Sequence, residues 1–223
     1  MLRAPSGFRQ GLTLGQTSRM ASTSPLIPLL FFGLIGLGIF SSLYNLRQRY
    51  KAWRAFAHRH GLSLAPSRQH ISGTYEGQQL ELKVEQRGSG NNRRSVTVLL
   101  LGVSDVVSRS LFLEREGLGD KFLKLFGRPD EELGDDEFDR YFDLKNLDPE
   151  SATLLRHPEV RHQLFTVAKT YRVFAIRQGQ LLVETYGVPS SLEALESFIQ
   201  PALVLVRTLK SANQGPSRRR ATS

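Results

Sequence analysis

The longest apolar run of the chain lies near its N-terminus, where residues 25–44 read PLIPLLFFGLIGLGIFSSLY and no charge occurs between Arg19 and Arg47. Twenty helical residues at 1.5 Å each span about 30 Å, which matches the hydrocarbon thickness of a bilayer. The run is longer than the core of about 7–15 residues typical of a signal peptide, and no small-x-small cleavage site follows it. The pattern therefore predicts one uncleaved transmembrane helix over residues 25–44.

The next segment, residues 45–60, places basic and aromatic residues at helical spacing. It predicts a juxtamembrane basic amphipathic helix that continues the membrane helix and stops at Gly61. Tyrosine and tryptophan are enriched at membrane–water interfaces, and arginine and lysine reach from there to anionic headgroups. We therefore expect the membrane interface to be formed by Arg47, Arg49, Tyr50, Lys51, Trp53 and Arg54.

The positive charges that flank the apolar run predict its orientation. Five Lys/Arg residues lie within residues 47–59, whereas three arginines precede the run. Because cytoplasmic flanks carry the excess of positive charge, we expect a single-pass protein of the cell membrane with a cytoplasmic C-terminal domain. Residues 1–24 are expected to be a disordered N-terminal segment, and a start at Met20 would strengthen the bias by removing all three arginines. A transit peptide is a second, less favoured interpretation of these residues.

From residue 69 the pattern changes to the period of two that is typical of half-buried strands. Two hairpins are expected, one around Glu76-Gly77 and one around Gln178-Gly179. Residues 95–103, SVTVLLLGV, are apolar on both faces and predict a central strand. The expected strands are 71–75, 80–84, 95–103, 110–114, 141–145, 171–177 and 180–186.

Helices are expected between these strand pairs. Asp148 and Pro149 form an N-cap and first helical residue, and His157-Pro158 repeats the start signal, so two short helices or one bent helix should reach residue 169. The remaining expected helices are a short one over 118–126 and a long one that begins with a Ser190/Glu193 capping box and bends at Pro201. Local strand pairs with interleaved helices predict an α+β domain over residues 61–209, built on a mostly antiparallel sheet with packed helices and preceded by the transmembrane helix. Residues 210–223 should form a basic, disordered tail.

Composition and charge exclude several classes of function. The chain has 223 residues, no cysteine and a net charge of +9. Residues 1–75 carry nine basic and no acidic residues, and the other 21 basic residues are balanced by 21 acidic ones. The positive charge therefore belongs to the membrane segment and its flanks, and the domain is not expected to bind nucleic acid. The lack of cysteine excludes disulfides and thiolate chemistry.

The acidic stretch at residues 130–143 is the strongest candidate for chemistry. Asp135, Asp136 and Asp139 are the residues there that could contact a partner or a cation. Aromatic residues interrupt the run and the spacing is not that of a calcium loop, so a solvated loop and strand edge is the favoured interpretation. No metal, cofactor or catalytic residue is assigned.

The segment from Gly134 to Leu164 resembles a set of bacterial membrane-anchored proteins of unknown function. The resemblance rests on an F-D-x-x-F element at Phe138, Asp139 and Phe142, and on a second element at Ala152, Leu154 and Leu155. It implies a membrane-tethered domain and no particular activity.

These patterns together predict a membrane-tethered binding or scaffold domain that acts through an unknown protein partner at the cytoplasmic face. The expected partners are the lipid bilayer and that protein. Gly38 and Ser42 form a small-xxx-small pair, so a homo-oligomer through the transmembrane helix is left open. The alternative function is a membrane-anchored hydrolase that uses the carboxylates from Asp135 to Asp139 with a divalent cation.

Overall fold

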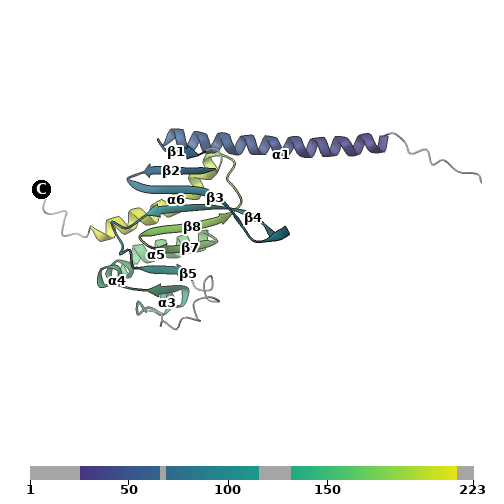
Figure 1. The fold of residues 1–223 in the computed structure, drawn as a ribbon. Helices are drawn as coiled ribbons and strands as arrows, with labels where there is room; N and C mark the ends of the chain where they lie inside the picture. The colour runs from purple at the N-terminus through teal and green to yellow at the C-terminus, as the bar shows by residue number, and fades with distance from the viewer. Residues whose placement is uncertain (1–25, 66–68, 116–131, 215–223) are drawn as a thin grey trace, which may run out of the picture. The chain divides into compact units, whose positions relative to one another are not determined.

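The computed structural model describes residues 26–65, 69–115 and 132–214 (Figure 1). The side chains of residues 26–36, 38, 39 and 91 are not part of this description. The chain divides into two compact units, residues 1–42 and residues 43–223. The second unit carries the sheet and the described helices after α1.

Helix α1 runs from Leu26 to Arg59 without interruption, across both of the predicted helical segments. Within the described residues, no helix is both long and apolar enough to cross a membrane. The side chains of residues 25–36, 38 and 39, which make up most of the predicted transmembrane segment, lie outside the described residues.

One antiparallel sheet of eight strands forms the centre of the second unit, in the order β1-β2-β3-β4-β8-β7-β5-β6. This confirms the predicted α+β class with an antiparallel sheet. The short edge strand β1, which the sequence pattern did not predict, pairs with β2. The strands are β1 (Ser63–Ala65), β2 (His70–Tyr75), β3 (Gln78–Arg87), β4 (Arg94–Gly102), β5 (Phe112–Arg115), β6 (Phe142–Lys145), β7 (Val173–Arg177) and β8 (Gln180–Tyr186).

Both predicted hairpins are confirmed. Glu76-Gly77 joins β2 to β3, and Gln178-Gly179 joins β7 to β8. In each turn both residues have positive φ, +50° and +76° in the first and +54° and +70° in the second. Two-residue turns of this handedness match the twist of the strands that they join, and glycine adopts the second position without strain.

The last three helices begin at or within one residue of the positions that the sequence predicts. Asp148 caps α4 through its side chain and Pro149 is the first residue of that helix, whereas α5 begins at Pro158 without a side-chain cap from His157. Helix α6 is capped by Ser191, whose side chain accepts from Ala194 N, so the predicted cap at Ser190 is wrong by one residue. These helices are α3 (Asp136–Tyr141), α4 (Pro149–Arg156), α5 (Pro158–Thr170) and α6 (Leu192–Asn213), with a short 3-10 turn η2 (Gly90–Asn92) between β3 and β4.

Two boundaries differ from the prediction. Helix α6 extends to Asn213, so residues 210–213 are helical and do not belong to the predicted tail. The helix expected over residues 118–126 and the tail from residue 215 onward lie outside the described residues.

The helices pack on one face of the sheet. Alternate residues of the central strand, Leu99 and Leu101, contact the main core, to which α1, α3, α4, α5 and α6 all contribute. Helices α5 and α6 are drawn behind the sheet in Figure 1. The opposite face carries a small separate apolar cluster, formed by Val96, Val98 and Leu182 with the partly buried Leu100 and Val173.

Candidate functional site

The predicted acidic site is a helix start. Asp135 is the N-cap of α3, since its carboxylate accepts from Phe138 N at 3.0 Å, and it also pairs with Arg161 at 2.7 Å. The backbone hydrogen bond from Phe138 is the main reason why the pKa of Asp135 lies below its ordinary value, and Arg161 adds to the effect. Asp136 is exposed in the first helical turn. The expected loop and strand edge is therefore corrected to a short capped helix.

Asp139 stabilises the chain segment that precedes α3. Its carboxylate accepts from Leu133 N, Gly134 N and Asp135 N at 2.7, 2.9 and 2.8 Å. A carboxylate that accepts several backbone N–H groups has little capacity left for a substrate or an ion. Within the described ranges, no group of three or more histidine, aspartate or glutamate side chains is placed to hold a metal ion.

Asp139→Ala is therefore expected to lower the free energy of unfolding by about 2 kcal/mol, because three charge-assisted hydrogen bonds are lost and the buried Leu133 N is left unsatisfied. Chemical denaturation of the full chain in mild detergent, followed by circular dichroism, measures the effect. The exposed neighbour Asp136→Ala is the control, with a change of about 0.5 kcal/mol or less. A metal-dependent gain in melting temperature that Asp139→Ala abolishes would instead support the hydrolase alternative.

The predicted membrane-interface residues fall into two groups. Trp53 is fully buried in the core, and its Nε1 donates to Pro189 O at 3.2 Å. Its assignment to the membrane interface is therefore wrong, because the indole ring fastens α1 to the domain together with Ala52, Phe56 and Ala57. The sequence pattern gave no means to distinguish an interfacial tryptophan from one that packs on a neighbouring domain.

The other predicted interface residues remain on the surface of α1. Arg49 is half-buried, and the exposed ones are Arg47, Tyr50, Lys51 and Arg54. Large apolar side chains on the same helix are also exposed, between 54 and 70% for Leu37, Phe40, Leu43, Tyr44 and Leu46. Among the described side chains of α1, those from Leu37 to Leu46 thus form an exposed apolar surface that is followed by cations.

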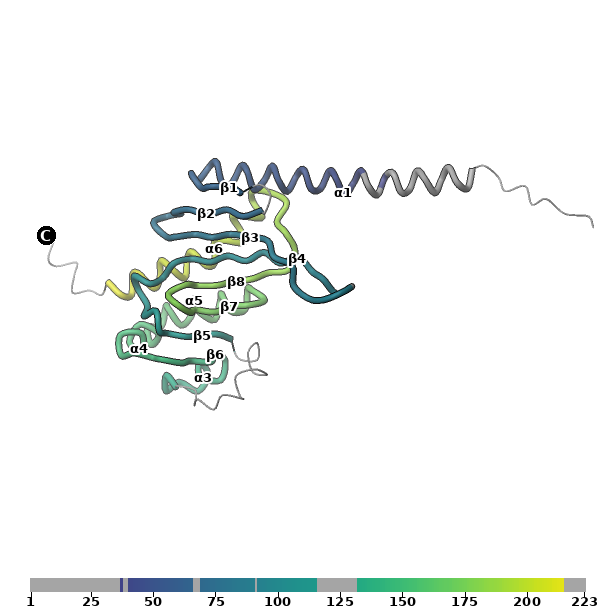
Figure 2. Tube along the Cα trace, viewed as in Figure 1, coloured from purple at the N-terminus to yellow at the C-terminus, as the bar shows by residue number. Residues whose placement is uncertain are grey.

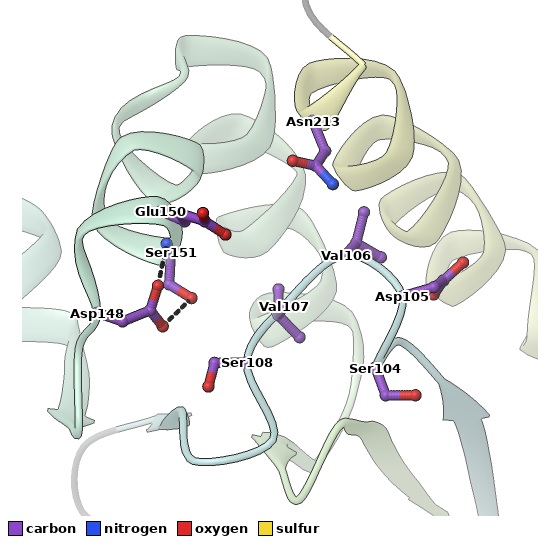
Figure 3. A pocket seen from close by; sticks show the side chains of 9 residues that line it. All are labelled: Ser104, Asp105, Val106, Val107, Ser108, Asp148, Glu150, Ser151 and Asn213. Carbon is purple, nitrogen blue, oxygen red and sulfur yellow. Dashed lines mark hydrogen bonds between the residues drawn. The ribbon is translucent and has the colours of Figure 1, made fainter.

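A polar hollow lies at the far end of the sheet from Trp53. The loop of residues 104–108 passes between the start of α4 and the end of α6, as Figure 3 shows. The hollow has a volume of about 340 Å³ and adjoins a second one of about 510 Å³, with Glu150 and Asn213 in both linings. Its lining consists of Ser104, Asp105, Val106, Val107, Ser108, Asp148, Glu150, Ser151 and Asn213.

Most carboxylates of this hollow are held by structural contacts. Asp148 accepts from Ser151 N at 2.9 Å and from Ser151 Oγ at 2.6 Å, and the hydroxyl is the main cause of the lowered pKa of Asp148. Asp105 pairs with Lys210 at 2.8 Å. Glu150 and Asn213 lie at the rim that both hollows share. The Ser151 hydroxyl is engaged with Asp148 in the cap of α4, and the arrangement suits hydrogen bonding to a polar segment of a partner.

The sequence interpretation did not single out this hollow. Its residues come from three separate segments, the 104–108 loop, the start of α4 and the end of α6. Only Asp148 had been assigned a role, as a helix cap. The available signal was the serine and aspartate content of the segment SDVVS between two strands, which indicates a loop but not its neighbours.

Comparisons with known proteins leave the family open. No protein-family model and no curated protein matches the chain. Among solved structures, the chain is similar to the mycobacterial trehalose monomycolate transport factor A, TtfA, with 16% sequence identity and a TM-score of 0.40, over 74% of this chain and 94% of that one.

Proposed function

We propose that this protein is a single-pass, membrane-tethered binding or scaffold domain that acts through a protein partner at the cytoplasmic face of the cell membrane. Residues 25–44 form the anchor, residues 45–60 the juxtamembrane helix and the α+β domain the binding module. The resemblance of residues 134–164 to bacterial membrane-anchored proteins agrees with this role. A homo-oligomer through the anchor remains an alternative assembly.

The observation that carries the proposal is the exposed apolar surface of α1. Five large apolar side chains between Leu37 and Leu46 are more than half exposed, and the first charge that follows is Arg47. Burying a large apolar side chain is worth about 1.5–3 kcal/mol, so such a surface requires an apolar environment. The cluster of basic residues after it is typical of the cytoplasmic flank of an anchor.

The binding role is supported by the polar hollow and by the engagement of the acidic stretch in structural contacts. Asp135 and Asp139 cap and brace α3, so their geometry gives no support to the hydrolase alternative. Glu150 lies in the hollow and is exposed. It is the residue whose change tests the hollow most directly.

Membrane extraction tests the anchor. The full chain is expected to stay in the membrane pellet after washing with alkaline carbonate. Leu34→Arg/Leu37→Arg should release most of the protein, because each arginine near the centre of a membrane helix costs about 2.5–3.5 kcal/mol. Glu159→Arg/Gln180→Arg, at two exposed positions of the domain, is the matched control and should remain in the pellet. Extraction of the unchanged protein by carbonate would contradict the proposal.

Orientation and partner binding have separate tests. A reporter fused after Ser223 should be active only as a cytoplasmic reporter. Crosslinking of the membrane-bound protein should then yield a reproducible partner whose recovery falls with Glu150→Arg and not with Glu159→Arg on the neighbouring helix. Equal recovery with both variants would remove the hollow from the binding site.

A further inference from the structure

An exposed tyrosine between two arginines stands at the end of strand β8. Tyr186 is 53% exposed, and the guanidinium carbons of Arg172 and Arg94 lie 4.5 and 5.6 Å from the centroid of its ring. Cations at such distances are attracted to the face of an aromatic ring. The ring thus holds two positive charges together at the surface.

These positive charges lack compensation in the described part of the chain. Arg87 lies at the end of β3, opposite Arg94 in β4. It pairs with Glu184 at 2.7 Å and with Glu85 at 2.8 Å, so both of these carboxylates already have a cationic partner. Neither Arg94 nor Arg172 has an ion-pair partner among the described residues, and the shielded Nε of Arg172 makes no hydrogen bond there. Two arginines that have no acidic partner among the described residues favour an anionic ligand.

The direction of α1 indicates which end of the sheet lies toward the N-terminal side of this helix. Arg59 pairs with Glu196 in α6, whereas Trp53 contacts Pro189, which precedes that helix. Moving from Arg59 back toward the N-terminus of α1 therefore leads toward the segment that follows Tyr186. That segment is joined to β4, since Gly187 N donates to Ser95 O at 2.9 Å. The polar hollow lies at the opposite end of the sheet.

Helix α1 beyond Trp53 and the β3–β4 hairpin beyond Tyr186 extend over similar distances. From Trp53 to Arg47, the first charge after the predicted anchor, α1 rises about 9 Å at 1.5 Å per residue. The β3–β4 hairpin extends past the end of β8 in Figures 1 and 2. Val96 is opposite Tyr186, so Asn92 near the hairpin tip can lie as far as about 13 Å beyond it at 3.3 Å per residue. The hairpin can therefore reach the level at which the predicted headgroup region begins.

We propose that Arg94 and Arg172, held by Tyr186, bind the phosphate groups of anionic lipids in the bilayer that anchors the chain. This inference rests on the proposed membrane anchor. The contact docks the basic end of the sheet on the leaflet and leaves the polar hollow facing away from it, open to a partner. Removing both charges should shift the equilibrium between docked and undocked domain by about 30-fold, which corresponds to about 2 kcal/mol.

The lack of cysteine allows a site-specific test on the full chain. Asn92→Cys, labelled with an environment-sensitive fluorophore, reports on the hairpin in vesicles that carry a nitroxide quencher at the headgroup. In phosphatidylcholine with about one-third phosphatidylglycerol, we expect several-fold stronger quenching at residue 92 than at a label on Asn146→Cys. Asn146 follows β6 at the other end of the sheet and is exposed.

Charge-neutralising variants identify the ligand. Arg94→Gln/Arg172→Gln, vesicles of phosphatidylcholine alone, or salt of about 1 M, where the Debye length is about 3 Å, should each reduce quenching at residue 92 to the level at Asn146. Arg109→Gln/Arg177→Gln removes the same charge from exposed positions at the opposite end and should leave it unchanged.

Two outcomes would overturn the inference and differ in what else they contradict. If the protein floats with the vesicles but quenching at residue 92 is weak or insensitive to Arg94→Gln/Arg172→Gln, the lipid contact is wrong and the anchor stands. If the protein does not float with the vesicles, the anchor is wrong and the contact fails with it.

Discussion

Trp53→Ala is expected to lower the free energy of unfolding by about 3–5 kcal/mol, the range for removing a fully buried large aromatic side chain. The indole ring is 0% exposed and packs in the main core beside Phe56, and its Nε1 donates to Pro189 O. The substitution creates a cavity between α1 and the domain and leaves a carbonyl without its donor. Chemical denaturation must be followed by circular dichroism, because Trp53 is the single tryptophan of the chain.

Tyr50→Ala is the matched control for Trp53. Tyr50 lies one turn earlier on the same helix and is 37% exposed, so its removal should cost about 1 kcal/mol or less. An interfacial role for both residues would make the two effects similar. Equal effects of Trp53→Ala and Tyr50→Ala would therefore restore Trp53 to the membrane interface and contradict its place in the core.

Phe138→Ala is expected to have an effect of the same size, about 3–5 kcal/mol. Phe138 is 0% exposed, and its ring centroid lies 4.7 Å from that of Phe142 and 6.0 Å from that of Phe165. Phe142 also contacts Phe174, so the cluster joins α3, β6, α5 and β7. Removing its first ring should loosen the edge of the sheet that contains β5 and β6.

Two further variants serve as comparisons for the stability of Phe138→Ala. Phe138→Leu keeps most of the apolar volume. It should therefore lower the free energy of unfolding by about 1–2 kcal/mol less than the alanine variant does. Glu137→Ala, at an exposed position of the same short helix, should leave the stability within about 0.5 kcal/mol. A Phe138→Ala protein as stable as the Glu137→Ala protein would show that the aromatic cluster does not hold α3 to the sheet.

The F-D-x-x-F element that carries the resemblance is accounted for by these contacts. Phe138 and Phe142 are core rings, and Asp139 binds three backbone N–H groups. Leu154 and Leu155 of the second element are core residues of α4. The residues that make the segment recognisable thus serve the fold, which explains why they bring no catalytic group.

Local patterns predicted the elements of the domain well because each depends on neighbours in the sequence. Alternation placed β3, a run that is apolar on both faces placed β4, two-residue turns placed both hairpins, and Asp148-Pro149 placed the start of α4. The errors also have local causes. The local pattern around Asp135 and Asp136 is that of a solvated loop. The capped helix is shown only by two hydrogen bonds, from Phe138 N to the Asp135 carboxylate and from Asp135 N to the Asp139 carboxylate. Strand β1 is too short to show any period, and it exists because β2 offers it a partner.

The sequence by itself determined the antiparallel α+β class, the paired strands and the uncharged apolar run with its basic flank, because periodicity and charge are properties of neighbouring residues. Tertiary structure alone decided which face of α1 is buried, so that Trp53 belongs to the core while Tyr50 stays exposed. It also decided that Arg94, Arg172 and Tyr186 meet at one end of the sheet and that three distant segments line the polar hollow at the other. Such groupings depend on strand order and helix packing, which join residues far apart in the chain and leave no period in the sequence to read.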